Sequence, residues 1–357
     1  MPIRPIWRLR ETAMATICCL APSAAWSQQL AKPNVFIAAT GGTIAGAQTN
    51  IEKHGYTAGT VGIDALIVAV PQLKDIANVT GEQVVNIPSQ DMNDAAWLKL
   101  AKRLQELEQS ETVDGIVVRH STDTMEETSF FVALTVSTRK PIVFTGSMRP
   151  STVISPDGPM NLYNAVAVAG SPLAKSCGVV VVFDGQINTA RNVYKTDTTR
   201  PDAFRSVDRG PCVAVDTGKV DVFRDCANGA YAEPKVPIES IGSLPKVEIV
   251  DAYAGMGRDL IDAAVASGAK GLVIAGVGDG NFTTEAFAGL RDAHKKGVVV
   301  VRSTRVASGF TTRNAEVDDD AEGFVAAEEF KPSRVILQIA LLKTSSPIEI
   351  QRDFDAW

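Results

Sequence analysis

The sequence predicts an α/β protein with two domains. The larger N-terminal domain would be a doubly wound, mostly parallel sheet, and the smaller C-terminal domain a second α/β unit. Short apolar runs typical of buried strands alternate with stretches of helical periodicity. This alternation stops over the proline-containing stretch 228–245 and then resumes. A length of 357 residues also favours two domains over one.

The N-terminus has the three-part pattern of a signal peptide. Arginines at positions 4, 8 and 10 precede a short apolar run at 13–20, and Ala25-Trp26-Ser27 offers small residues for a signal peptidase. We expect cleavage near Ser27 and export to the periplasm. Because no later apolar run reaches the roughly 18 residues that a membrane helix needs, we expect no membrane partner. The expected organisation is a signal peptide at 1–27, an N-terminal catalytic domain at 28–227, a linker at 228–245 and a C-terminal domain at 246–357.

Five buried strands are expected in the N-terminal domain, at 34–40, 83–88, 116–118, 140–145 and 178–183. Helices are expected after residue 91, from Met125 and within 155–170. Four strand ends are followed by polar residues: Thr43, Ser89-Gln90, Thr122-Asp123 and Ser147. Since the carboxyl ends of parallel strands meet at one edge of a sheet, these side chains predict a polar cleft.

In the C-terminal domain the same rhythm predicts strands at 246–253, 271–276 and 297–303, with helices at 258–267 and 284–296. The net charge of −6 argues against nucleic acid as the main partner, because phosphate binding needs a basic surface. The run Asp318-Asp319-Asp320 is interpreted as a solvated loop in preference to a Ca²⁺ site.

The five cysteines show no zinc or haem spacing, and we expect neither a metal nor another cofactor. Cys18 and Cys19 fall within the expected signal peptide. Cys177 precedes a strand and is expected to be a buried thiol. Cys212 and Cys226 flank an expected hairpin around Thr217-Gly218, and an exported protein permits a disulfide between them.

The stretch Gly115 to Phe131 reads as strand, polar turn and helix. Its turn places Thr122 and Asp123 where ligands bind in α/β sheets. A structural explanation competes, because Thr124 and Glu127 match a capping box. Taken alone, the stretch slightly favours that structural explanation.

With other catalytic patterns excluded, a threonine hydroxyl is the remaining candidate for the nucleophile. The three histidines, His54, His120 and His294, give no convincing triad, and TGGT lacks the further residues of a phosphate-binding loop. A threonine needs a neighbouring base to become a nucleophile, and Tyr56, Asp123 and Lys195 are the candidates. From these residues alone, a plain surface ion pair is the preferred explanation of Lys195.

Six motifs resemble the bacterial-type L-asparaginases, the exported type II branch in particular. They are TGGTIAG (40–46), SQDMND (89–94), HSTDTMEET (120–128), GSMRPST (146–152), DGPMNLYNAV (157–166) and AEVDD (315–319). The resemblance implies hydrolysis of L-asparagine to L-aspartate and ammonia. It also implies a homotetramer in which active sites are shared between subunits.

Carried over by position, the resemblance implies that Thr43 is the nucleophile that forms an acyl-enzyme and that Tyr56 helps to activate it. Thr122, Asp123 and Lys195 would handle protons and activate water, and the backbone N–H of Thr122 is a candidate oxyanion donor.

For substrate binding the resemblance implies Ser89 and Gln90 at the α-carboxylate and α-amino group, with Asp123 at the ammonium. Glu316 would reach in from the partner subunit.

Four residues depart from the family pattern: Pro88, Arg119, Ser121 and Gly255. Ser121 replaces a glycine before the Thr-Asp pair, and Gly255 removes a polar side chain, which leaves the choice between asparagine and glutamine open. A glutaminase-asparaginase is therefore an alternative. An alternative of another class is a periplasmic amino-acid binding protein, which would not need the Thr-Asp-Lys set.

Overall fold

The computed structural model of the protein describes residues 31–41, 67–224, 226, 233–331 and 333–357. The expected signal peptide and the candidate residues Thr43 and Tyr56 lie outside these residues.

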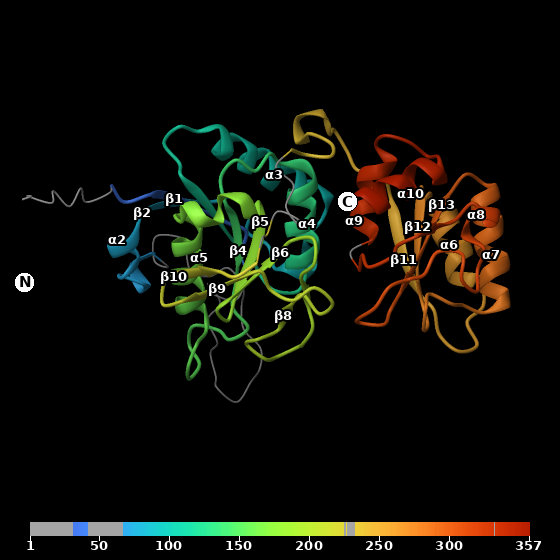
Figure 1. The fold of residues 1–357 in the computed structure, drawn as a ribbon. Helices are drawn as coiled ribbons and strands as arrows, with labels where there is room; N and C mark the ends of the chain where they lie inside the picture. The colour runs from blue at the N-terminus through green and yellow to red at the C-terminus, as the bar shows by residue number, and fades with distance from the viewer. Residues whose placement is uncertain (1–30, 42–66, 225, 227–232, 332) are drawn as a thin grey trace, which may run out of the picture. The chain divides into compact units, whose positions relative to one another are not determined.

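The N-terminal domain is built on an eight-stranded mixed sheet with the order β10-β9-β6-β5-β4-β3-β1-β2, and the strands from β5 to β2 in this order run parallel (Figure 1). The strands are β1 (Asn34–Ala39), β2 (Asn78–Gln83), β3 (Gly115–Arg119), β4 (Ile142–Thr145), β5 (Val179–Phe183), β6 (Gln186–Thr189), β9 (Val213–Asp216) and β10 (Lys219–Val222). A separate ribbon pairs β7 (Tyr194–Lys195) with β8 (Phe204–Arg205).

Both faces of this sheet are covered, as the doubly wound prediction requires. Side chains of a strand alternate between faces, and in β3 Ile116 and Val118 pack in one apolar cluster while Val117 packs in another. The first cluster includes α3 (Asp94–Gln109) and α4 (Met125–Thr135). The second includes α2 (Leu73–Ile76) and α5 (Gly158–Ala169).

The C-terminal domain contains a four-stranded parallel sheet with the order β11-β12-β13-β14. Its strands are β11 (Val247–Asp251), β12 (Gly271–Gly276), β13 (Val299–Thr304) and β14 (Val325–Ala326). Its helices are α6 (Asp259–Ala266), α7 (Thr284–Lys295), α8 (Asp319–Glu322), α9 (Ser333–Leu341) and α10 (Pro347–Ala356). Three 3₁₀ turns complete the described chain: η2 (Ser89–Asp91), η3 (Pro172–Cys177) and η5 (Ile238–Ser240).

The expected strand at 83–88 is shifted in the structure. The strand β2 ends at Gln83, and the chain then turns toward β1. The N–H of Val84 donates to the carbonyl of Ala39, and the N–H of Ile87 donates to the carbonyl of Thr40. The apolar residues at 83–88 predicted a strand. An apolar run, however, does not distinguish a strand paired within a sheet from a segment that passes across the end of a neighbouring strand.

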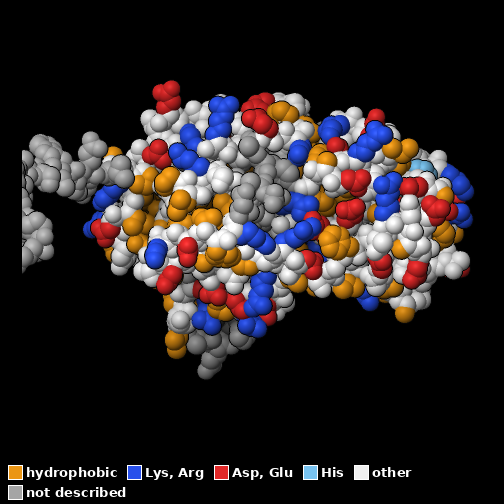
Figure 2. All heavy atoms as spheres, in the orientation of Figure 1, with side chains coloured by type: hydrophobic (Ala, Val, Ile, Leu, Met, Phe, Trp, Pro, Cys, Tyr) orange, Lys and Arg blue, Asp and Glu red, His pale blue; other side chains and the backbone are white. Residues whose placement is uncertain are grey.

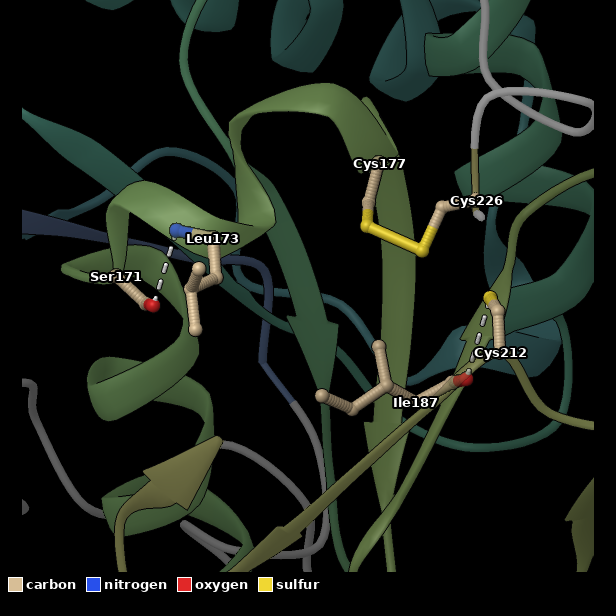
Figure 3. The surroundings of a disulfide bond; sticks show 6 residues. All are labelled: Ser171, Leu173, Cys177, Ile187, Cys212 and Cys226. Carbon is tan, nitrogen blue, oxygen red and sulfur yellow. Dashed lines mark hydrogen bonds between the residues drawn. A yellow bond between two sulfur atoms is a disulfide. The ribbon is translucent and has the colours of Figure 1, made fainter. Parts of the chain in front are cut away.

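The predicted disulfide between Cys212 and Cys226 is wrong. Cys226 is bonded to Cys177, with 4.8 Å between the two Cα atoms, and Cys212 is a buried free thiol (Figure 3). The predicted hairpin does form, because Thr217 and Gly218 both adopt positive φ angles between β9 and β10. However, the Cys212 thiol donates to the carbonyl of Ile187 on β6. Cys226 therefore forms its disulfide with the more distant Cys177 and not with Cys212, which is nearer in sequence.

The acidic run at 318–320 is not a solvated loop. The Asp319 side chain is fully buried in an ion pair with Arg302 of β13, at 2.7 Å. Asp318 accepts from the N–H of Ala321 as the N-cap of α8, and Asp320 pairs with Arg313. These three carboxylates therefore stabilise the fold of the C-terminal domain.

Within the part of the chain that the structure describes, no helix is long and apolar enough to span a bilayer. On the face shown in Figure 2, lysine and arginine side chains are interspersed with aspartate and glutamate.

Candidate active site

Three strand ends meet at one edge of the large sheet. After β1, the backbone N–H of Thr40 and its Oγ1 both donate to the carbonyl of Arg119 at the end of β3, at 3.0 and 3.2 Å. Gly41 follows with a φ of +108°, and a Cβ at this position would lie 2.5 Å from the carbonyl oxygen of Ile87. Only glycine fits such a close approach. The TGG sequence therefore allows the chain to leave β1 beside the segment that leads to Ser89.

Ser89 connects its own segment to the turn after β3. Its hydroxyl, which is buried, accepts a hydrogen bond from the backbone N–H of Asp123 at 3.1 Å. Its carbonyl oxygen accepts a hydrogen bond from Oγ1 of Thr124 at 2.8 Å. Two reciprocal contacts thus fix the Ser89 backbone against the Thr122-Asp123 turn.

The predicted capping box is wrong. Thr124 does occupy the N-cap position of α4, but its side chain makes no capping hydrogen bond and donates to Ser89 instead. Glu127 faces Arg334 of α9, with 3.6 Å between Oε2 and a guanidinium nitrogen. Both side chains therefore join segments that are distant in sequence.

Lys195 completes a three-residue polar cluster. Its Nζ donates to Oγ1 of Thr122 at 3.1 Å and to Oδ1 of Asp123 at 2.7 Å. The Thr122 residue is 5% exposed and the Lys195 side chain 17%, whereas the Asp123 side chain is 52% exposed. The cluster is therefore closed on one side and open on the other, so Lys195 is not the plain surface ion pair that the residues alone favoured.

The other candidates are placed differently. Gln90 is exposed in η2, directly after Ser89. Ser147 is buried after β4, and its hydroxyl donates to the carbonyl of Arg149 within its own turn. Glu316 is exposed in the loop before α8, and within the described residues it shares no hydrogen bond with the Thr122-Asp123-Lys195 cluster.

At the end of β3, just before Thr122, burial shifts the pKa values of two basic side chains, Arg119 and His120. His120 is fully buried, and burial lowers its pKa to about 4, so the imidazole is neutral at pH 7. Its Nδ1–H donates to the carbonyl of Ser121. Burial also lowers the pKa of Arg119 to about 10, and its guanidinium has no hydrogen-bond partner in the described part of the chain.

Ser121 itself is tolerated without backbone strain. It is buried and is not one of the described residues with a positive φ, so this backbone position does not require glycine. At Gly255, by contrast, φ is +76° and a side chain would meet open space. The two departures from the family pattern thus have different structural settings.

No sequence pattern pointed to Glu126, which also belongs to this region. The carboxylate of Glu126, in the first turn of α4, accepts the backbone N–H of Lys195 at 2.5 Å. The residues lie 69 positions apart. Their pairing follows from the position of the short ribbon β7–β8 against α4, for which the sequence carries no local signal.

The arrangement is suited to proton transfer. An amine lies within hydrogen-bond distance of both a hydroxyl and a partly exposed carboxylate, and this geometry allows a proton to move between them. A hydroxyl next to a basic amine can also serve as a nucleophile or activate water. Within the described residues no group of three or more histidine, cysteine or acidic side chains is placed to hold a metal ion.

Comparison with known proteins assigns the family. The model of the N-terminal asparaginase domain matches residues 34–228, and that of the glutaminase/asparaginase C-terminal domain matches residues 246–354. The chain is 47% identical over 350 residues to L-asparaginase 2 of Escherichia coli (strain K12), covering 98% of this chain and 99% of that protein. It is 45% identical over 350 residues to the probable periplasmic L-asparaginase of Haemophilus influenzae, with the same coverage of both chains. It is also 43% identical over 325 residues, 90% of each chain, to the glutaminase-asparaginase of Pseudomonas fluorescens biotype A. The chain therefore belongs to the asparaginase family and carries both domains of that family in order.

Proposed function

We propose that the protein is an exported L-asparaginase, which hydrolyses the side-chain amide of L-asparagine to L-aspartate and ammonia. The observation that carries this proposal is the contact of Lys195 Nζ with Thr122 and Asp123, held against Ser89 at one edge of the sheet. The names of the full-length relatives, which include L-asparaginase 2, support the same activity.

In the proposed reaction, Thr43 is the nucleophile. Its Oγ adds to the amide carbon of the substrate as its proton passes to the Thr122-Asp123-Lys195 cluster, from which it can reach the leaving nitrogen, and Tyr56 donates a hydrogen bond that orients Thr43. The tetrahedral intermediate collapses with cleavage of the C–N bond, and the nitrogen takes up a proton and leaves as ammonia. The result is an aspartyl ester on Thr43. The backbone N–H of Thr122 would stabilise the oxyanion in this step.

Deacylation would use the Thr122-Asp123-Lys195 cluster. Lys195 lies close enough to Thr122 and Asp123 to relay a proton from an attacking water. Water adds to the ester carbon, and the bond between this carbon and Thr43 Oγ then breaks. Thr43 Oγ takes up a proton, so aspartate is released and the free hydroxyl is restored. His120 takes no part as a base, because burial lowers its pKa to about 4 and its Nδ1 is bonded to Ser121.

We further propose that Ser89 and Gln90 bind the α-carboxylate and α-amino group of the substrate and that Asp123 contacts the ammonium. The exposed oxygen atoms of Asp123 are available for this contact. The site would be completed by the partner subunit's Glu316 in a homotetramer. The exposed position of this side chain in the loop before α8 is compatible with a role in a second copy of the chain.

The activity is tested by ammonia release from the purified mature protein. Thr43→Ala should abolish turnover of asparagine and leave the thermal unfolding temperature unchanged, whereas Thr43→Ser should retain part of the activity. Absence of ammonia from both asparagine and glutamine in the wild type would refute the proposal. Calorimetric binding of asparagine without any product over hours would instead support the amino-acid binding protein.

A second candidate is a glutaminase-asparaginase, which hydrolyses glutamine at a comparable rate. Two observations favour keeping it. Three relatives named glutaminase-asparaginase are 39–43% identical to this chain, and Gly255 has no side chain that could discriminate between the two substrates. The ratio of kcat/KM for asparagine to kcat/KM for glutamine on one preparation decides between the two candidates.

Export and domain organisation are also part of the proposal. We propose periplasmic localisation with a signal peptide at 1–27, catalytic and C-terminal domains at 28–227 and 246–357, and a linker at 228–245. The relative from Haemophilus influenzae is named as periplasmic, which supports the location. N-terminal sequencing of the protein recovered from the periplasm should begin at or near Gln28. Sedimentation equilibrium should give the mass of four chains.

A further inference from the structure

The side-chain amine and the backbone N–H of Lys195 are both bound by one short segment of the chain, residues 122–126. Its Nζ donates to Thr122 and Asp123 in the turn before α4. Its backbone N–H donates to the carboxylate of Glu126, one turn further along, at 2.5 Å. The proposed reaction uses the first set of contacts and leaves the second without a role.

The strand that carries Lys195 has little other support. It consists of two residues, Tyr194 and Lys195, and it pairs only with the equally short β8 in the described structure. So short a ribbon has few ladder hydrogen bonds to fix its position. The bond to Glu126 is therefore the contact that ties the Lys195 backbone directly to α4.

We propose that Glu126 is a positioning residue for Lys195 and that its ionisation sets the acid limb of the pH dependence of the reaction. This inference rests on the proposed amidase function. Glu126 is not placed against the substrate and is not assigned a catalytic step. It acts by holding the backbone from which the Lys195 amine reaches Thr122 and Asp123.

The electrostatic surroundings place the ionisation of this carboxyl in a useful range. The pKa of Glu126 is raised to about 7, chiefly by burial and also by the neighbouring carboxylates Glu127 and Asp123, while the N–H and the amine of Lys195 act to lower it. On β7, Tyr194 also faces Glu126, but its own pKa is raised by burial to about 12, so it stays neutral.

A change of charge alters the strength of the bond to Lys195. The ionised carboxylate accepts a charge-assisted hydrogen bond, which is stronger and shorter than a neutral one. Protonation below pH 7 weakens that bond and removes a negative charge near the Lys195 amine. As pH falls through about 7, β7 should loosen, and kcat/KM should fall by roughly fivefold.

The test compares the wild type with Glu126→Gln, which keeps an oxygen acceptor of the same size but cannot ionise. Both are assayed for asparagine hydrolysis from pH 5 to pH 9, with kcat and KM determined separately. We expect the variant to lose the acid limb near pH 7 and to match the protonated wild type at all pH values. Glu126→Ala removes the hydrogen-bond acceptor, and its kcat/KM should be lower than that of the wild type and of Glu126→Gln.

The matched control is Glu127→Gln. Burial also raises the pKa of Glu127, but its carboxylate pairs with Arg334 and not with Lys195. This variant should keep the acid limb of the wild type. A Glu126→Gln enzyme with an unchanged limb, or a Glu127→Gln enzyme that loses it, would overturn the inference.

A second measurement does not depend on activity. Amide hydrogen exchange at Lys195, corrected for its intrinsic pH dependence, should be slower in the wild type at pH 8 than at pH 5.5. Glu126→Gln should abolish this difference. Equal exchange in the wild type, Glu126→Gln and Glu126→Ala would refute the positioning role even if the wild type proved inactive. An inactive wild type with the expected exchange would instead refute only the proposed function.

Discussion

Each domain of this protein contains a polar cluster beside its parallel sheet, and the two clusters differ in how many polar atoms stay accessible. In the C-terminal domain Arg302 of β13 and Asp319 are both 0% exposed and share two hydrogen bonds, at 2.7 and 2.8 Å. Arg302 also donates to the carbonyls of Asp279 and Thr312. Its donors are thus distributed over three segments, and the loop that carries Glu316 is folded around them.

In the N-terminal domain the Thr122-Asp123-Lys195 cluster has the opposite character. The Lys195 amine has two partners in the cluster, and the Asp123 side chain remains 52% exposed. The partly open cluster has acceptor atoms left for a substrate, whereas the closed one does not. A cluster of charged side chains beside a parallel sheet therefore does not by itself identify a functional site. Unsatisfied and accessible polar atoms are the more useful criterion.

The largest expected effect is a loss of activity on substitution in the partly open Thr122-Asp123-Lys195 cluster. Lys195→Met should reduce kcat/KM for asparagine by about 10²–10⁴-fold, because a group that transfers protons is lost. The free energy of unfolding should change by less than about 1 kcal/mol, because Asp123 keeps access to solvent. Steady-state assays and urea unfolding check the two statements. Lys246→Met, at an exposed ion pair with Glu248, is the control and should alter neither.

The closed cluster should respond in the reverse way. Asp319→Ala leaves the Arg302 guanidinium buried without its counter-charge and should lower the free energy of unfolding by about 3–5 kcal/mol. Asp320→Ala, at the neighbouring exposed pair, should cost less than about 1 kcal/mol. Urea unfolding of the two variants provides the measurement. Similar losses in both would mean that burial does not separate the two aspartates.

A smaller effect on stability is expected at Glu126. Its folded pKa of about 7 lies above the ordinary 4.5, so the folded state binds a proton more tightly than the unfolded one. This contribution to stability is fully present below pH 4.5 and is lost as pH rises through 7. Glu126→Gln should therefore gain roughly 3 kcal/mol over the wild type on going from pH 4.5 to pH 8. Urea unfolding at both pH values checks this. A constant difference between the two proteins would contradict it.

The smallest expected effect concerns the contact between Ser89 and the turn before α4. Thr124→Val removes the hydrogen bond to the Ser89 carbonyl and should cost about 1 kcal/mol of stability. It should also raise KM for asparagine more than it lowers kcat, since Ser89 is proposed to bind substrate. Thr124→Ser retains the hydroxyl and should behave as the wild type. A change confined to kcat would place Thr124 in the reaction rather than in substrate positioning.

Much of the fold followed from the sequence, because apolar periodicity is a local property. Buried strands such as β3 and β5 are continuous apolar runs, and these were predicted within one or two residues. The strand expected at 83–88 was the exception, since backbone hydrogen bonds to Ala39 and Thr40 hold this segment across the end of β1. The family resemblance implied that Ser89, Thr122, Asp123 and Lys195 belong to one site, and in the structure these four residues are linked by hydrogen bonds.

The sequence by itself determined the alternation of strands and helices, the hairpin at Thr217-Gly218 and the polar strand ends, because each depends on neighbouring residues. Only the tertiary structure decided which partners those residues take. Cys226 pairs with Cys177, Asp319 with Arg302, and the Lys195 backbone with Glu126, each across at least 17 positions. Such pairings depend on how separate elements pack, and a charge or thiol carries no local signal of its distant partner. The sequence therefore indicated which polar side chains to expect at the candidate site, whereas the contact that positions Lys195 became visible only in three dimensions.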